Sequence, residues 1–216
     1  MADPKGTTPP SVLPSTRVFL YARLRGKQRD WRELRAHLDA RSLPALAPSD
    51  VHLWGAWFGL FGLRSNELLV ITSWPDDVKD AGGQFTAALP IDTEVIEMLE
   101  FVATVRPLDD EERTRDGLYV FRFFDVMHRD VEEIAALSNE AWTYFESTDA
   151  YAATPQALFC QRDRALPEGR MLLLTWYDGL QSWQLSRTPA PEATANFRRR
   201  HELTLGQVPY ATRLAK

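Results

Sequence analysis

The sequence carries one pattern twice, with the two copies about 100 residues apart. Three pairs of segments align in the same order: VFLYARLRGKQRDWREL at 18–34 with LYVFRFFDVMHRDVEEI at 118–134, LVITSWPD at 69–76 with MLLLTWYD at 171–178, and ATVRPL at 103–108 with ATRLAK at 211–216. The second pair places Trp74 over Trp176. Because a repeated pattern indicates a repeated supersecondary unit, the chain is predicted to consist of two similar halves.

Hydrophobic periodicity predicts the same order of elements in each copy: strand, helix, strand, strand, helix, strand. In the first copy, strands are expected at 17–24, 52–61, 67–74 and 96–106, and helices at 30–41 and about 77–88. In the second copy, strands are expected at 118–125, 156–163, 170–177 and 207–214, with a helix at 130–146 and helical segments between 179 and 203. The order is that of the ferredoxin-like βαββαβ unit. The predicted fold class is therefore α+β, with two such units in tandem and antiparallel sheets.

The domain organisation follows from the repeat. Residues 1–16 are expected to form a flexible tail, 17–108 the first ferredoxin-like repeat, 109–117 a charged connector and 118–216 the second repeat. In both copies an aspartate begins the first helix and a glutamate follows three residues later, as Asp30 with Glu33 and Asp130 with Glu133. This spacing is typical of a capping box, so these four carboxylates are expected to cap the two helices.

A sheet that is covered by helices on one face must also bury its other face. Two such sheets can pack face to face or close into a barrel, within one chain or between two chains. The alternation of the first strands assigns an aromatic set to the interior and a smaller aliphatic set to the helix side. The interior set is Phe19, Tyr21 and Arg23 with Tyr119, Phe121 and Phe123; the helix-side set is Val18, Leu20 and Ala22 with Leu118, Val120 and Arg122. Arg122 fits its set poorly.

The space between the sheets is either a ligand cavity or a filled aromatic core, and the sequence leaves both readings open. The residues expected to line a cavity are Tyr21, Arg23, Trp57, Thr72, Trp74, Tyr119 and Trp176. An arginine or a tyrosine among aromatic side chains is suited to a planar or acidic ligand. The expected partner is therefore a small apolar or aromatic molecule.

Composition limits the classes of function. The chain has 216 residues and a formal net charge of −5, with charges of both signs interspersed, which argues against nucleic acid as a partner. Its one cysteine, Cys160, can form no internal disulfide, and the first fifteen residues lack a signal-peptide pattern, so a cytoplasmic location is expected. The apolar stretch 51–63 is too short for a membrane helix. No metal-ligand spacing or phosphate-binding loop occurs, so neither a metal nor a cofactor is predicted.

One stretch resembles a known family. The spacing Gly55-x-Trp57, then Phe61-Gly62, Asn66 and an apolar strand ending in Trp74, is similar to that of the NIPSNAP family within the dimeric α/β-barrel superfamily. The tandem arrangement extends the resemblance over nearly the whole chain after residue 16. The first strand departs from the family's Glu-x-Arg-x-Tyr pattern, because the corresponding positions hold Arg17, Phe19 and Tyr21.

The resemblance implies a fold and a pocket more than a reaction. Relatives in the wider superfamily include cofactor-independent monooxygenases and isomerases as well as haem-binding enzymes, so an oxygenase or isomerase acting on a ligand between the sheets is one hypothesis. A non-catalytic structural or interaction protein with a filled core is the second. A haem protein is the third, with His201, late in the second helical region, as the candidate ligand. Since single-unit relatives dimerise through the sheet face, a homo-oligomer is expected.

Overall fold

The computed structural model describes residues 16–188 and 191–216, so the predicted tail lies outside the described residues apart from Thr16. The first half contains β1 (Val18–Arg25), α1 (Arg32–His37), a π-helical turn (Leu38–Ser42), α2 (Leu43–Leu46), a short 3-10 turn (Ala47–Ser49), β2 (His52–Phe61), β3 (Glu67–Trp74), α3 (Ala81–Ala88) and β4 (Glu94–Ala103). The second half contains β5 (Leu118–Met127), a short 3-10 turn (His128–Asp130), α4 (Val131–Glu146), β6 (Ala153–Gln161), β7 (Glu168–Tyr177), α5 (Leu180–Leu185), α6 (Pro191–Glu202) and β8 (Thr204–Leu214). The predicted fold class is confirmed, because each half has the βαββαβ order.

The eight strands close into one barrel in the order β1-β3-β2-β8-β5-β7-β6-β4. Every neighbouring pair is antiparallel, and two short ladders join the halves: β2 with β8, and β4 with β6. The barrel therefore closes within a single chain. Because the inner faces of the two sheets cover each other, they are not free to pair with a second copy, and self-association of the chain stays a prediction.

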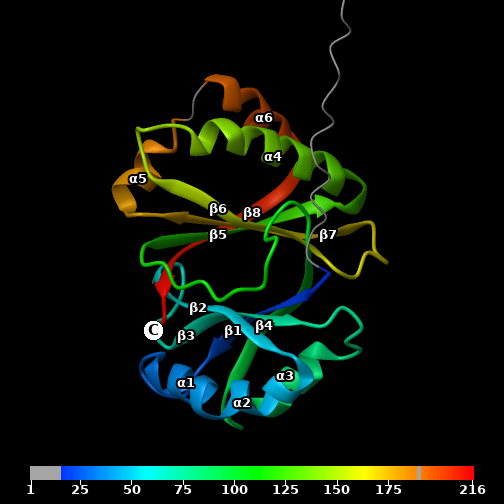
Figure 1. The fold of residues 1–216 in the computed structure, drawn as a ribbon, viewed down its shortest axis with the longest axis vertical. Coiled ribbons are helices and arrows are strands. Elements are labelled where there is room, and N and C mark those ends of the chain that lie inside the picture. The colour runs from blue at the N-terminus through cyan, green and yellow to red at the C-terminus, as the bar shows by residue number, and fades with distance from the viewer. Residues whose placement is uncertain (1–15, 189–190) are drawn as a thin grey trace, which may run out of the picture.

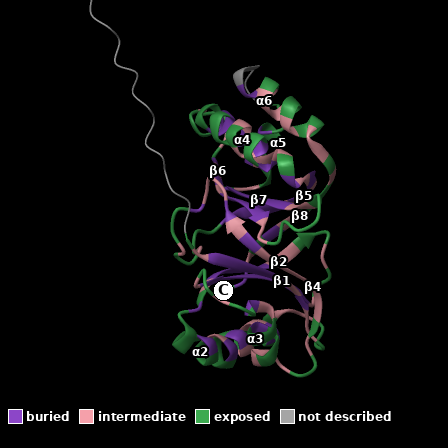
Figure 2. Cartoon of the chain, turned by 90° about the vertical axis from the view of Figure 1, so that its right-hand side faces the viewer, coloured by how far each residue is buried: buried purple, intermediate pink, exposed green. Residues whose placement is uncertain are grey.

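Helices cover the outer face of each half. In Figure 1, α1, α2 and α3 lie below the sheets and α4, α5 and α6 lie above them, with the strands in between. Buried residues concentrate on the strands and on the helix faces turned toward them, as Figure 2 shows. Among the helices of the described part, none is long and apolar enough to cross a bilayer.

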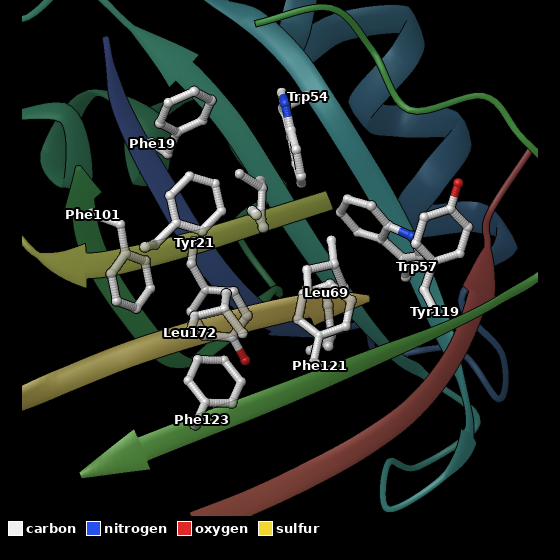
Figure 3. Close-up of a cluster of buried hydrophobic side chains, with 14 of the residues drawn as sticks. Phe19, Tyr21, Trp54, Trp57, Leu69, Phe101, Tyr119, Phe121, Phe123 and Leu172 are labelled. Atoms are coloured by element: carbon white, nitrogen blue, oxygen red, sulfur yellow. The ribbon is translucent and has the colours of Figure 1, made fainter. Parts of the chain in front are cut away.

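The inner face of the barrel is filled by aromatic rings (Figure 3). The predicted alternation is confirmed: Phe19, Tyr21, Tyr119, Phe121 and Phe123 belong to the interior cluster, whereas Val18, Leu20, Ala22, Leu118 and Val120 pack under the helices. The centroids of the Tyr21 and Phe123 rings are 4.9 Å apart, and those of Trp57 and Phe121 are 5.1 Å apart. Rings at these separations are in contact, so the space between the sheets is a packed core.

The glycine-rich stretch of β2 has a steric cause. A side chain at Gly55 would overlap the indole ring of Trp57, which lies two residues further along the same face. Trp57 itself is fully buried. Glycine at 55 therefore makes room for a tryptophan that fills the barrel.

The alignment of the second pair of repeat segments is wrong by one residue. Val18 is paired with Trp74 across β1 and β3, and Leu118 is paired with Tyr177 across β5 and β7. Since Val18 and Leu118 are equivalent, Trp74 corresponds to Tyr177 and not to Trp176. Side chains alternate along a strand, so Trp74 lies under the helices of the first half while Trp176 lies in the interior.

The predicted capping boxes are confirmed only for the side chain of Asp30. The N-cap of α4 is Asp130, but its side chain accepts no capping hydrogen bond from the described residues. At the start of α1, Asp30 Oδ1 accepts a hydrogen bond of 2.9 Å from the backbone N–H of Arg32, although the N-cap residue of the helix is Trp31. Glu133 forms an ion pair with Arg199 of α6, with 2.7 Å between Oε1 and Nε, so it links two helices instead of closing one.

Candidate ligand pocket

A cavity of about 630 Å³ lies on the outer face of the second half, between the sheet and the three helices α4, α5 and α6. Its floor comes from β5, β6, β7 and β8, including Val120, Leu173 and Ala211. Its walls are largely aromatic: Phe124, Trp142, Phe145, Tyr177, Trp183, Phe197 and Tyr210. This volume is in the range that ordinary small-molecule sites occupy.

The two halves differ in how their helices close over the sheet. In the first half, the outer face of the sheet carries the aliphatic residues Leu20 and Ala22. The helices pack on these residues and form a continuous apolar cluster with them. In the second half, the position equivalent to Ala22 is Arg122, and one long helix, α4, packs beside α6 while α5 is only six residues long. Helix α5 ends at Leu185, and α6 begins at Pro191, since proline is favourable in the first turn of a helix. A space therefore remains over the second sheet.

Two arginines project from opposite sides of this space. Arg122 comes from β5, and Arg200 comes from the last turn of α6. The guanidinium of Arg200 lies 5.0 Å from the centroid of the Phe197 ring and 5.5 Å from that of Phe124, and its Nη1 donates a hydrogen bond of 3.2 Å to Ser138 Oγ. Among the described residues that line the cavity, no aspartate or glutamate occurs.

Burial lowers the pKa of both arginines. The pKa of Arg122 falls below its ordinary value, and that of Arg200 falls to about 10, with the positive charge of Arg122 as a second cause. A desolvated cation next to a like charge is costly unless an anion compensates it. The electrostatics of the pocket therefore favour an anionic group inside it.

The rim of the pocket is polar. Exposed Arg187 and His201 both line it, and Thr204 Oγ1 donates a hydrogen bond of 2.9 Å to the backbone oxygen of His201 where α6 ends. Deeper in, the indole Nε1 of Trp183 is buried and has no hydrogen-bond partner among the described residues. Because this atom has almost no accessible surface, as is also true of the unpartnered indole Nε1 atoms of Trp54 and Trp57 in the packed core, it does not face the cavity.

The sequence-predicted site residues lie elsewhere. Tyr21, Trp57, Tyr119 and Trp176 belong to the packed interior, where Trp176 Nε1 donates to the Asp116 backbone oxygen at 2.9 Å. On the opposite face, under the helices of the first half, the Nε1 of Trp74 donates to Thr72 Oγ1 at 2.7 Å. Their role in ligand binding stays a prediction.

Arg23, the remaining predicted residue, reaches the pocket wall indirectly. Its Nη1 donates a hydrogen bond of 3.1 Å to the hydroxyl of Tyr210, which lines the cavity. Its Nη2 forms an ion pair of 2.6 Å with Glu67. The Tyr210 ring itself packs against the interior cluster and contacts Phe123, so this hydrogen bond lies on the inner side of β8.

Sequence reasoning missed Arg122 and Arg200 as site residues, although one signal was present. Arg122 is a charged residue in a strand position that should be apolar, and a charge on a buried strand face is a candidate for a functional site. Arg200 gave no such signal, because the run RRRH at 198–201 reads as a solvated helix face. His201, the candidate haem ligand, does line the pocket.

The chain thus contains two ferredoxin-like βαββαβ units whose sheets close into one α/β barrel. No protein-family model matches the chain, and no curated protein matches it either. The resemblance to the NIPSNAP family therefore stays a prediction.

Solved structures share the fold over almost the whole chain. An anthrone oxidase-like protein superposes with a TM-score of 0.60 at 15% identity, covering 94% of this chain and 92% of the other. A candidate monooxygenase from Lactobacillus acidophilus gives 0.57 at 12% identity, covering 94% and 97%. A chlorite dismutase variant from Candidatus Nitrospira defluvii gives 0.55 at 10% identity, covering 95% and 94%. At such identities the likeness shows the fold alone.

Proposed function

We propose that this protein binds a small molecule with a flat, apolar or aromatic body in the pocket under α4, α5 and α6. The observation that carries the proposal is a cavity of about 630 Å³ with predominantly aromatic walls and a few polar groups. The ligand is thus placed on the outer face of the second half, whereas the packed rings of the interior leave it no comparable space.

The reaction class we propose is oxygenation or isomerisation of the bound ligand without a resident cofactor. Its support is the descriptions of two proteins of the same fold, one anthrone oxidase-like and one a candidate monooxygenase. Within the described lining, the imidazole of His201 is the group best suited to accept a proton from a bound substrate. Oxygen consumption on adding a hydroxylated aromatic compound, lost in His201→Ala, is the measurement that checks this reaction.

Haem is the second candidate ligand, and His201 at the pocket rim is the observation that favours it. A bound haem would use an imidazole as axial ligand and would supply redox chemistry at its iron. Titration of the protein with hemin should then give a Soret band that shifts in His201→Ala. An unchanged spectrum of free hemin at equimolar protein would remove haem from consideration.

The pocket itself is tested with the neutral fluorescent probe N-phenyl-1-naphthylamine. We expect its fluorescence to rise on binding and the rise to disappear in Ala211→Phe, because Ala211 lies on the cavity floor and a phenyl group there occupies the ligand's space. The matched control is Ala45→Phe, an exposed position of α2 in the other half, which should bind the probe as the parent does. Circular dichroism would confirm that both variants are folded.

Two results would contradict the proposal. The first is no fluorescence change with the parent protein at micromolar probe. The second is equal binding by the parent and a folded Ala211→Phe variant, which would place the probe somewhere other than this cavity.

A further inference from the structure

Arginines in this protein are neutralised wherever they are withdrawn from solvent, with two exceptions. In the described part of the chain ten arginines are partly buried, and eight of them form an ion pair with an aspartate or a glutamate. Arg23 and Arg25 share Glu67, for example, and Arg170 is paired with Glu97 and Asp125. The two without an acidic partner among the described residues are Arg122 and Arg200, and both line the pocket. A partly buried cation is normally paired, so these two lack a counter-charge that something else must supply.

The strand neighbours of Arg122 explain why the protein itself does not supply that charge. Arg122 is opposite Leu173 on β7 and opposite Pro209 on β8. An acidic residue at either position would face it directly across the ladder, as Glu67 of β3 faces Arg25 of β1. The sheet therefore surrounds Arg122 with apolar side chains and directs its charge into the cavity.

The lining around the two guanidinium groups is largely aromatic. Guanidinium groups bind the two oxygens of a carboxylate in a fork geometry. The rest of the wall, including Phe124, Trp142 and Phe197, offers apolar contact to a ring.

We propose that the ligand is an aromatic acid whose carboxylate is bound between Arg122 and Arg200 while its ring packs against the aromatic walls. This rests on the proposed function, since it specifies the chemistry of the ligand in the same pocket. The uncompensated positive charge selects an anion over a neutral molecule of the same shape, so charge is the main determinant of specificity.

A pair of probes that differ by one anionic group tests separately whether the pocket binds a ligand and whether it prefers an anion. N-phenyl-1-naphthylamine is neutral, and 8-anilinonaphthalene-1-sulfonate has the same ring system with a sulfonate. We expect Arg122→Gln and Arg200→Gln each to raise the dissociation constant of the sulfonate probe by about tenfold to a hundredfold. This is the effect typical of losing a hydrogen bond to a charged group. Binding of the neutral probe should change less than twofold. Arg213→Gln, an exposed arginine of β8, is the matched control.

Competition identifies the anion. 2-Naphthoate should displace the sulfonate probe at least tenfold better than 2-naphthamide, and inorganic phosphate should not displace it at the same concentrations. Displacement by phosphate alone would overturn the choice of an aromatic carboxylate.

A stability measurement on the parent and variant proteins without ligand adds an independent readout. Removing an unpaired, desolvated charge relieves a cost, so Arg122→Gln should melt at a higher temperature than the parent in the absence of ligand. 2-Naphthoate should raise the melting temperature of the parent but not that of the variant. This comparison remains decisive if the Arg200→Gln variant does not fold.

The outcomes are distinguishable. If neither probe binds, the proposed function fails. If the neutral probe binds and the sulfonate probe is no more sensitive to Arg122→Gln and Arg200→Gln than the neutral one, the pocket stands and the aromatic-acid inference is wrong.

Discussion

Replacing Trp57 by alanine should lower the free energy of unfolding by about 3–5 kcal/mol, the usual cost of truncating a large buried aromatic side chain. Trp57 is fully buried in the barrel interior, and its ring contacts those of Trp54, Tyr119 and Phe121 at centroid distances of 5.9, 5.7 and 5.1 Å. Urea titration followed by circular dichroism measures the change. The folded variant should still bind N-phenyl-1-naphthylamine as the parent does, because the pocket lies on the other side of the sheet.

The role of Gly55 in seating this ring can be measured in the same experiment. Gly55→Ala should cost about 1–3 kcal/mol, since its Cβ would overlap the Trp57 indole in a core with no room for the ring to move. With Trp57 already alanine, the same change should cost little or nothing, so the double-mutant cycle should show strong coupling. Additive effects would mean that the glycine serves another purpose. Loss of probe binding in folded Trp57→Ala would restore the sequence-based assignment of Trp57 to the ligand site.

The second large effect is expected at Glu67, whose side chain is completely buried at one end of the barrel. Its carboxylate accepts hydrogen bonds from Arg23 at 2.6 and 3.0 Å and from Arg25 at 2.9 and 3.1 Å. Glu67→Ala leaves two guanidinium groups without this partner, and removal of one side of a buried ion pair costs about 3–5 kcal/mol. Because both arginines are partly exposed, we expect about 2–4 kcal/mol. Urea titration at pH 7 measures it, and Glu94→Ala, which removes only the exposed partner of Arg25, is the control.

The contribution of Glu67 should depend on pH in a definite direction. Burial alone would raise the pKa of Glu67, but hydrogen bonds and charge from Arg23 and Arg25 outweigh it and hold the pKa below the ordinary value. A depressed folded-state pKa contributes stability that is fully present above the unfolded pKa, about 4.3, and is lost as the pH falls through the folded value. The difference in stability between the parent and Glu67→Gln should therefore be constant from about pH 7 to about pH 5 and shrink below about pH 4. A difference that grew on acidification would contradict this account.

Glu67 also orders the interior at this end of the barrel. It is paired with Arg23, and Arg23 donates a hydrogen bond to Tyr210, whose ring contacts Phe123 in the interior. In the duplicated architecture, the first half packs its outer face under its helices, while the second half keeps a cavity under its helices. The same unit serves as scaffold in one copy and as candidate site in the other.

Local periodicity was enough to predict the elements and the faces of the strands. The ranges of β2 and β3 agree with the expected strands, and the inward and outward sets of β1 and β5 were assigned correctly, because alternation is a property of a few consecutive residues. The one-residue error that paired Trp74 with Trp176 shows the limit of this reasoning. Sequence similarity alone could not fix the register, and a shift of one residue moves a side chain to the other face.

The sequence by itself determined two ferredoxin-like units, an aromatic inner set and one misplaced charge at Arg122, since repeats and periodicity are local. Only the tertiary structure decided that the aromatic set is a filled core, that the barrel closes within one chain, and that Arg122 from β5 and Arg200 from α6 line the same cavity. Along the chain, α4, the hairpin of β6 and β7, and α5 separate these two arginines. Their meeting depends on how α6 packs over the sheet, and that packing is a long-range outcome with no signature in any single stretch of residues.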